Sequence, residues 1–273
     1  MPGRPDLPPT RTLAWLYSAA ERGVLAALCG LEREVGASLA PGLDHQVAHT
    51  RLAWWREECA RCLEGRAQHP LTRELGPLFA GQPAALAGLG GLVDTAVWDL
   101  AAATFETRRE LDAYCERWSA ALVEPLAHHA VPDLAPGQAR RLGRTLRELE
   151  LLLALPRDAR AGRLRLPLDE LAAAHAAPAS LASPRWPPGL AALVRARHRA
   201  LRTELAAAVA ALAPPQQRPL RGLLVWAALT AGHSRRAEGD LPRAAAAGEH
   251  HAPLDGWRAW RDARRAQAHR QRL

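Results

Sequence analysis

Residues 142–171 read LGRTLRELELLLALPRDARAGRLRLPLDEL, and this stretch decides how the rest of the sequence is interpreted. Leucines recur at helical spacing over residues 142–153, which predicts a long helix with an apolar face. Pro156 predicts the end of that helix, and a basic turn around Gly162 leads into a Leu-Pro pair. The stretch therefore predicts a buried helix that ends in an arginine-rich turn.

Helical periodicity continues through most of the chain, which is rich in Leu and Ala and 48% hydrophobic. In one predicted helix an apolar face combines Leu52, Trp55, Cys59 and Cys62. A second carries a continuous stripe of Leu111, Tyr114, Trp118, Leu122 and Leu126. We expect an all-α fold with helices at about 10–30, 44–65, 70–80, 83–103, 107–129, 137–155, 189–213 and 216–236.

The predicted organisation has three parts. Residues 1–10 form a Pro-rich arm that we expect to be disordered, and residues 11–236 form the helical domain. Residues 237–273 form a linker and a basic terminal helix that contains tryptophan. No apolar run reaches the length needed to span a bilayer, and we expect no cleaved signal.

The charge of the chain favours anionic partners. The formal net charge is +8 and every one of the 36 basic residues is arginine. Much of this excess lies at the C-terminus beside Trp257 and Trp260. Two interpretations remain open: a solvated terminal helix, or an interfacial helix on an anionic membrane. The chain carries no recognised nucleic-acid-binding module, so nucleic acid is not an expected partner.

The four cysteines predict neither a disulfide framework nor a zinc site. Cys59 and Cys62 have the spacing of a zinc or redox motif, but Cys29 and Cys115 offer no second pair. We expect buried core cysteines in a reducing compartment.

Two regions resemble the signature regions of the squalene/phytoene synthase family. Residues 31–58 (LEREVGASLAPGLDHQVAHTRLAWWREE) correspond to a region that reads like REVDDIVDE in that family. Residues 142–171 are similar to its QLTNILRDVAEDARRGRIYLP region. The sequences WDL at 98–100, ELDAYCER at 110–117 and the tract 198–236 extend the resemblance. It implies an isoprenoid-synthase-like single helical domain with a central cavity.

The resemblance fails at the residues that carry the family's chemistry. Enzymes of this kind hold Mg²⁺ between two Asp-rich helices, and the metal neutralises the substrate diphosphates. Here residues 33–40 read REVGASLA, without an aspartate. Ala154 and Arg157 stand where an Asp and a Glu are expected, and only Asp158 remains. Glu148 and Glu150 are two residues apart and do not share a helix face.

One branch that lacks these aspartates is the mitochondrial complex I assembly-factor group, together with its bacterial relatives. The chain resembles this branch in Gly36-Ala37-Ser38 and in the sequence LALP at 153–156. The preferred hypothesis is a non-catalytic protein, a pseudoenzyme that binds an isoprenoid or lipid or acts as an assembly factor. The alternative is an active Mg²⁺-dependent prenyltransferase that condenses isoprenyl diphosphates.

Several residues are candidates for the site. Arg33, Arg51 and Arg163 match arginines of the family pattern, whereas Arg165 replaces the Tyr of YLP. Arginine forks bind phosphate without a metal, so these residues and His49 are the candidate ligand-binding residues. The other interpretation is that the arginines solvate helix ends and that His49 is a structural histidine.

The alternative enzyme would use different residues. Asp158 would be its catalytic residue, and Glu34, Glu150 and Asp158 would hold Mg²⁺. The preferred hypothesis requires no cofactor. Its expected partners are an isoprenoid or lipid, a respiratory-complex protein and an anionic membrane surface. We expect a cytoplasmic protein, with peripheral attachment to the inner face of the cytoplasmic membrane as a further hypothesis.

Overall fold

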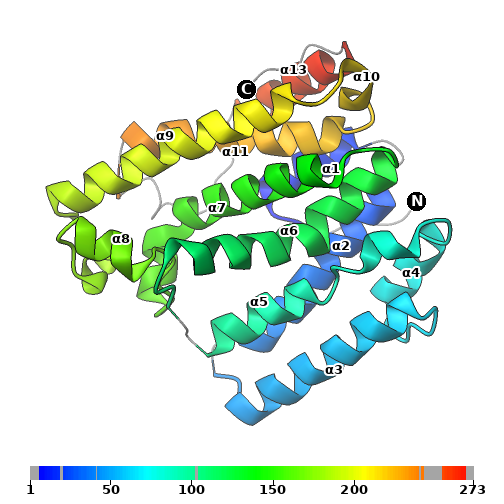
Figure 1. Ribbon diagram of the computed structural model, residues 1–273, viewed down its shortest axis with the longest axis horizontal. Coiled ribbons are helices and arrows are strands. Elements are labelled where there is room, and N and C mark those ends of the chain that lie inside the picture. Colours follow the sequence, from blue (N-terminus) through cyan, green and yellow to red (C-terminus); the bar gives the residue numbers. More distant parts are fainter. Residues whose placement is uncertain are drawn as a thin grey trace.

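The computed structural model describes residues 6–18, 21–40, 42–101, 104–239, 241–242 and 254–268. These residues form helices and no strand, which confirms the all-α prediction (Figure 1). Within them, no helix is both long and apolar enough to cross a membrane. The α-helices are α1 (Pro9–Tyr17), α2 (Arg22–Gly36), α3 (His45–Leu63), α4 (Pro70–Leu78), α5 (Gly91–Leu100), α6 (Arg108–Ala130), α7 (Pro136–Arg160), α8 (Leu168–Ala173), α9 (Pro188–Ala210), α10 (Pro214–Gln217), α11 (Arg221–Gly239) and α13 (Asp255–Gln267), with 3₁₀ turns η1 (Ala37–Leu39), η2 (Pro83–Leu86) and η3 (Pro178–Ala182).

Helices α6 and α7 form the central antiparallel pair. Helices α9 and α11 pack on α7, while α2 and α5 pack on α6 (Figure 1). Helices α3 and α4 lie outside α2 and α5, and α13 lies on α11 and α1. The C-terminal ends of α2 and α7 therefore lie inside the bundle, with other helices around them.

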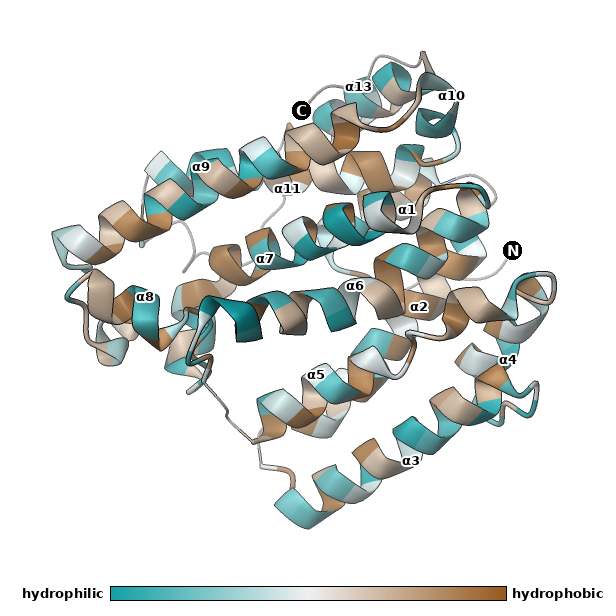
Figure 2. Ribbon diagram, in the orientation of Figure 1, coloured by the Kyte–Doolittle hydropathy of each residue, from teal (hydrophilic) through white to brown (hydrophobic). Residues whose placement is uncertain are grey.

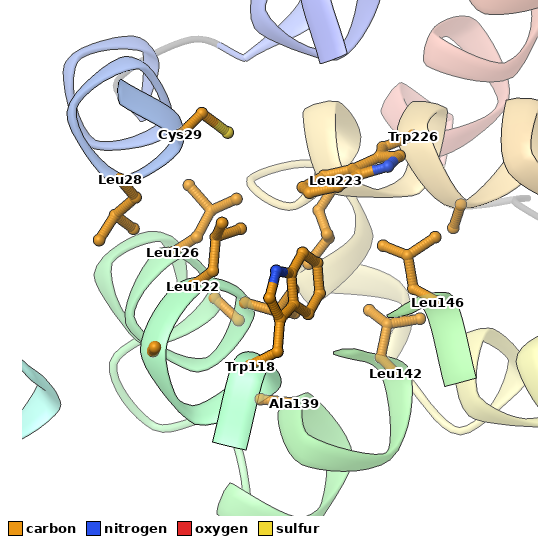
Figure 3. Close-up of a cluster of buried hydrophobic side chains, with 14 of the residues drawn as sticks. Leu28, Cys29, Trp118, Leu122, Leu126, Ala139, Leu142, Leu146, Leu223 and Trp226 are labelled. Carbon is orange, nitrogen blue, oxygen red and sulfur yellow. The ribbon is translucent and has the colours of Figure 1, made fainter. Parts of the chain in front are cut away.

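The core follows from the apolar stripes of the sequence. Figure 2 shows that the helices alternate between apolar and polar faces. At the centre, the rings of Trp118 and Trp226 meet nearly perpendicularly, with their centroids 6.0 Å apart. Leucines of α6 and α7 surround them (Figure 3). Both predicted stripes are buried: Leu52, Trp55, Cys59, Cys62, Leu111, Tyr114, Trp118, Leu122 and Leu126.

Two predicted helices are interrupted. The expected helix over 10–30 is two helices, because α1 ends at Tyr17 and α2 begins at Arg22. The expected helix over 83–103 is η2 followed by α5. Close packing explains the second interruption: a Cβ on Gly88 would lie 2.4 Å from the Ala120 carbonyl oxygen on α6. The chain between η2 and α5 thus approaches α6 more closely than a side chain allows.

The predicted end of the central helix at Pro156 is wrong. Helix α7 continues through Pro156 to Arg160. Proline removes one backbone donor and disfavours the preceding turn, but the last turn is held from outside the helix. The backbone N–H of Arg163 donates to the Asp158 carbonyl oxygen at 2.8 Å, and the Asp158 carboxylate binds Arg165.

The N-terminal arm differs in part from expectation, whereas the predicted terminal helix is present as α13. Residues 6–10 are ordered, because α1 begins at Pro9 and Leu7 packs against the core. Residues 1–5, most of the predicted linker and residues 269–273 lie outside the described part of the chain.

The four cysteines are free and buried, and burial raises the pKa of Cys29 to about 12 although Arg11 lies beside it.

Candidate functional site

A cavity of about 490 Å³ lies inside the bundle, within the usual size range of ligand pockets. Its wall combines apolar side chains with charged ones. The lining residues are Pro8, Thr10, Arg11, Glu32, Val35, Gly36, Leu39, Leu92, Thr95, Ala96, Asp99, Tyr114, Trp118, Arg147, Glu150, Leu151, Leu153, Ala154, Arg157, Asp158, Arg163, Arg165, Thr230, His233, Arg236 and Ala237.

The two altered signature regions meet at this cavity. Val35, Gly36 and Leu39 come from the end of α2 and from η1, and Ala154 and Asp158 come from the last turns of α7. The two segments that resemble the family's metal-binding motifs therefore face one space. Small and apolar side chains occupy most of these positions in this chain.

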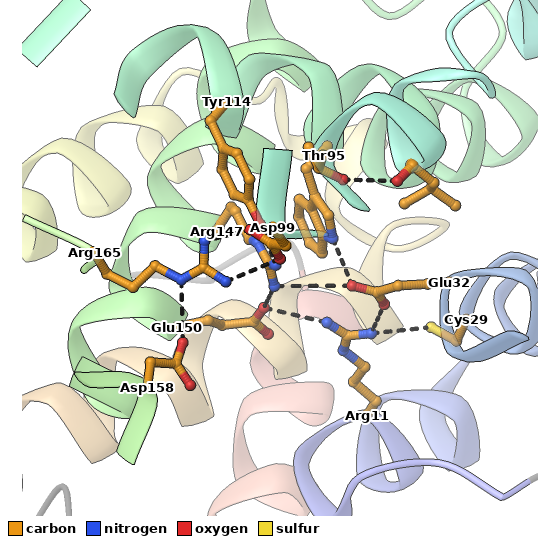
Figure 4. A network of polar contacts seen from close by, with 12 residues as sticks. Arg11, Cys29, Glu32, Thr95, Asp99, Tyr114, Arg147, Glu150, Asp158 and Arg165 are labelled. Atoms are coloured by element: carbon orange, nitrogen blue, oxygen red, sulfur yellow. Dashed lines mark hydrogen bonds and ion pairs between the residues drawn. The ribbon is translucent and has the colours of Figure 1, made fainter. Parts of the chain in front are cut away.

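An ionic network on one wall joins α1, α2 and α7 (Figure 4). Arg11 binds Glu32 and lies 3.2 Å from the Glu150 carboxylate. Arg147 lies 3.4 Å from Glu150 and 3.8 Å from Glu32. Two guanidinium groups thus hold two carboxylates in a closed cluster.

Aromatic rings complete this cluster. The indole N–H of Trp118 donates to Glu32 at 2.6 Å, and that of Trp226 donates to Glu150 at 2.9 Å. The Arg11 guanidinium lies 4.6 Å from the centre of the Trp226 ring. Cation–π contacts and charge-assisted hydrogen bonds together fix the cluster in one arrangement.

Arg165 organises the other wall of the cavity. It binds both oxygens of Asp99 at 2.6 and 2.9 Å, and its Nε donates to Asp158 at 3.2 Å. The Tyr114 hydroxyl donates to Asp99 at 3.2 Å and accepts from Arg147, which joins the two walls. The arginine that replaces the family's tyrosine therefore neutralises the one aspartate left from the second motif.

The buried charges shift the pKa values of their partners. Burial alone would raise the pKa of Glu32, but Arg11 and Arg147 hold it below its usual range. Burial opposes the charge of Arg165, yet its hydrogen bonds to Asp99 keep the pKa above its ordinary value. The pKa of Tyr114 is raised, chiefly by burial, so the phenol stays protonated and able to donate. The lowered pKa of Glu32 keeps this carboxylate ionised beside Arg11 and Arg147 at physiological pH.

The residues present do not fit the Mg²⁺ ions that the family resemblance implies. Mg²⁺ needs several carboxylate oxygens that are free to coordinate. The four carboxylates of the cavity are each bound by at least one arginine: Glu32, Asp99, Glu150 and Asp158. Among the described residues, no group of three or more His, Cys, Asp or Glu side chains could hold a metal ion.

Arginines exceed acids in the cavity wall. Six arginines line it against four carboxylates, and one of the six, Arg236, pairs with a fifth carboxylate behind the wall, Asp255, which leaves a formal charge of +1 with His233 neutral. Arg163 adds a buried Nε that has no hydrogen-bond partner among the described residues. Arg157 pairs only weakly, with its Nε 3.4 Å from Asp158 and its side chain 58% exposed. The surplus positive charge is therefore near Arg157 and Arg163, at the turn that follows α7.

The structure brings together only part of the predicted site. Arg163 and Arg165 line the cavity, as do Glu150 and Asp158 from the alternative metal set. Arg33, Arg51, His49 and Glu34 lie outside its lining, although the first three were expected at the ligand. Arg33 pairs with Asp6 and Glu34 at the surface, while Arg51 and His49 are exposed on α3.

The physical reason for these misplacements is the orientation of α2 and α3. Near the end of α2, Glu32 and Val35 face the cavity, and Arg33 between them faces outward. On α3, Ala48 and Leu52 are buried, which turns the intervening positions 49 and 51 to solvent. Glu148 also faces away from Glu150, as the spacing predicts, and binds Arg108 and Arg197.

Sequence reasoning missed several cavity residues. Glu32 and Arg147 are charged residues set among apolar positions of their helices, and Arg11 precedes an apolar run. That pattern can indicate an internal ion pair, but it does not identify the oppositely charged residue that completes the pair. The sequence indicates Asp99 only as part of the family-like WDL stretch at 98–100.

The fold and the cavity define the class of protein: an all-α bundle of the isoprenoid synthase type with an arginine-rich interior. A model of the squalene/phytoene synthase family matches residues 12–258. The chain therefore belongs to the squalene/phytoene synthase family.

Solved structures agree with this assignment at the level of the fold. A dehydrosqualene synthase crystallised with ligand superimposes with a TM-score of 0.76 and 16% identity, over 95% of this chain and 90% of that chain. The squalene synthase HpnC from Alicyclobacillus acidocaldarius gives 0.66 and 19% identity, over 84% and 87%. No curated protein matches the sequence.

Proposed function

We propose that this protein is a non-catalytic member of its family that binds an isoprenoid or lipid with an anionic head group. The observation that carries the proposal is the arginine pairing of the cavity's four carboxylates, together with a surplus of positive charge. Arginine forks bind phosphate oxygens directly, so such a site needs no metal.

The position of the surplus charge supports a particular ligand orientation. Arg157 and Arg163 lie at the turn after α7, while Leu92, Leu151 and Leu153 line the apolar part of the cavity. The head group would contact the arginines, and the hydrocarbon chain would occupy the apolar part. The unpartnered Nε of Arg163 supplies a donor whose burial without a partner is otherwise costly.

The assembly-factor resemblance adds a partner to this proposal. The absence of aspartates from residues 33–40, and the sequence LALP at 153–156, favour that branch over the synthases. A role beside a respiratory complex would place the protein in the cytoplasm, at the inner face of the membrane. The partner would then be a respiratory-complex protein, contacted while the cavity holds its lipid.

The alternative is an active prenyltransferase, and one observation favours it. Asp99 and Asp158 both line the cavity, and one guanidinium, that of Arg165, holds both. A movement of this single side chain would expose two carboxylates. A test of the proposal must therefore measure turnover as well as binding.

The decisive experiment uses farnesyl diphosphate as the probe. We expect titration calorimetry to detect binding in the presence of EDTA, and we expect no pyrophosphate release with Mg²⁺. Arg163→Gln should weaken binding roughly 10- to 100-fold, because a hydrogen bond to a charged group is worth about 1.5–3 kcal/mol. Farnesol, which lacks the anionic group, should bind more weakly than the diphosphate.

Arg33→Gln is the matched control, because Arg33 is exposed outside the cavity. It should leave the affinity unchanged. Pyrophosphate release that requires Mg²⁺ and disappears in Asp158→Ala would establish the enzyme instead. Absence of both binding and release would refute the proposal as well.

A further inference from the structure

Helix α13 buries both of its acids and leaves part of its arginines exposed. Its two acids, Asp255 and Asp262, are 1% and 4% exposed. Asp255 accepts a hydrogen bond from His233 at 2.8 Å and lies 3.3 Å from Arg236, both on α11. The acids therefore lie on the inner side of the helix, and Arg264 and Arg265 are exposed on its outer side.

The outer side of α13 also carries large exposed apolar groups. Trp257 is 55% exposed and Trp260 is 46% exposed, and Leu254 just before the helix is 57% exposed. Leu16 of α1 is 46% exposed and lines the same shallow groove as Trp260. These four residues, the Trp–Leu patch, are half of the eight large hydrophobic side chains that are exposed in the described part of the chain.

Arginine is paired with tryptophan within this patch. The Arg261 guanidinium lies 5.0 Å from the centre of the Trp257 ring, and that of Arg264 lies 5.1 Å from the Trp260 ring. An amphipathic ring beside a cation suits the head-group layer of a membrane, where one side is apolar and the other contacts phosphate. A merely solvated helix would have no need of two exposed tryptophans.

A groove between α1 and α13 provides a place for a head group. Leu16, Tyr17 and Trp260 give its apolar wall, and Arg221 and Arg264 contribute two guanidinium groups. Arg221 is already positioned by a hydrogen bond to the Tyr17 carbonyl at 2.6 Å. The arrangement matches a phosphate group with an attached hydrocarbon chain.

We propose that the Trp–Leu patch docks on an anionic phospholipid surface, with Arg221, Arg261 and Arg264 contacting the head groups. A second copy of the chain is a less favourable occupant. A two-fold interface would place the arginines of one outer face against the same arginines of the other. Anionic lipid supplies the opposite charge.

The docked helix is directly connected to the cavity wall. His233 and Arg236 line the cavity, and both bind Asp255 at the start of α13. Docking would thus hold the cavity beside the bilayer surface. The docking proposal does not depend on what the cavity binds.

Co-sedimentation of the full chain with vesicles tests the proposal. We expect binding to phosphatidylcholine vesicles that contain phosphatidylglycerol, and little binding to pure phosphatidylcholine. Trp257→Ala/Trp260→Ala should abolish measurable binding. Arg261→Gln/Arg264→Gln should weaken it about fivefold for each charge removed. Binding should fall as salt rises from 0.1 to 1 M, because the Debye length shrinks from about 10 Å to about 3 Å.

The matched control is Trp54→Ala on α3. Trp54 is 38% exposed and has Arg61 over its ring at 5.5 Å, so it copies the pairing on another part of the molecule. It should bind vesicles as the unchanged protein does. Deleting residues 254–273 is a poorer variant, because it would uncover Val225 and Leu229. Circular dichroism checks that each variant is folded.

Three results would overturn the proposal. The first is no binding of the unchanged protein to anionic vesicles. The second is equal binding by the double tryptophan variant, and the third is equal binding to neutral vesicles. Concentration-dependent dimerisation that the tryptophan variant loses, without any vesicle binding, would assign the patch to a second copy.

Discussion

The cavity and the outer face of α13 both contain many arginines, but they use them in opposite ways. In the cavity, Arg11, Arg147 and Arg165 are each bound to at least one carboxylate and lie against aromatic rings. On α13 the acids are turned inward, and Arg264 is exposed over the ring of Trp260 with no carboxylate bound to it among the described residues. Arg261 lies over Trp257 and keeps a single contact, at 3.4 Å, with Asp262. Burial accounts for the difference, because a guanidinium inside the protein needs a counter-ion and one at the surface does not.

A net charge of +8 does not by itself locate a binding site, because paired and unpaired arginines contribute to it equally. Most arginines of the interior are already neutralised by their neighbours. Those with charge to spare are near Arg163 in the cavity and near Arg264 on α13. An anionic group would therefore bind at one of these two places.

The largest expected effect comes from breaking the cavity pairs. Arg165→Met should lower the free energy of unfolding by about 3–5 kcal/mol, because it leaves the Asp99 and Asp158 carboxylates without their shared partner. Urea denaturation measures the change. Arg157→Met, at a side chain that is 58% exposed, should cost less than about 1 kcal/mol.

A triple variant separates charge from packing at this site. Arg165→Met combined with Asp99→Asn and Asp158→Asn removes the three charges together. Since Arg165→Met alone is costly chiefly because it leaves buried carboxylates without a counter-ion, removing those charges should restore part of the stability. If the triple variant is as unstable as Arg165→Met alone, the packing of the guanidinium stabilises this site more than its charge does. The need for a counter-ion would then not explain the arginine pairs of the cavity.

A smaller effect on the free energy of unfolding is expected from the protonation of His198, a buried group that has no counter-ion of its own. His198 is fully buried between α9 and α11, its Nδ1 lies 2.9 Å from Ser234 Oγ, and burial with nearby Arg202 lowers its pKa to about 4. The unfolded chain, with an ordinary pKa near 6.5, takes up the proton first. The stability is therefore complete above pH 6.5 and is lost as the pH falls toward 4.

His198→Gln tests this sign. Relative to its own value at pH 7, the unchanged protein should lose about 2 kcal/mol more than the variant at pH 5, at about 1.4 kcal/mol per pH unit. Titrations of groups that do not interact with His198 cancel in the difference. Parallel pH profiles for the two proteins would show that His198 becomes charged without cost and that the interior tolerates an uncompensated cation.

The sequence predicts the helical architecture well, because apolar periodicity depends only on local spacing. The stripe from Leu111 to Leu126 is buried as predicted. Where the prediction fails, contacts distant in the sequence override local signals. Pro156 remains inside α7 because Asp158 holds the next turn through Arg165, and Gly88 marks a break that only the approach of α6 explains.

The site was less predictable than the fold. Residue types near the family motifs identified Arg163, Arg165 and Asp158, since a motif fixes which turn they occupy. They did not identify Arg11, which reaches the cavity from α1 and binds Glu150 far along the chain. Periodicity says which face of a helix is apolar, but it does not say which distant charge lies opposite a charged residue on that face.

The smallest expected effect concerns the outer face of α13, where side chains should contribute little to folding. Trp257→Ala and Arg264→Gln should each change the free energy of unfolding by less than about 0.5 kcal/mol, because both side chains are exposed. Ala259→Leu on the inner face is the internal contrast: Ala259 is fully buried with Val225 and Leu229, so a larger side chain should cost about 1–3 kcal/mol. Thermal and urea unfolding in the absence of lipid give both values. A large loss in Trp257→Ala would mean that the tryptophan stabilises the fold, and its exposure would then say nothing about a membrane. A negligible loss, together with lost vesicle binding, assigns this tryptophan to docking.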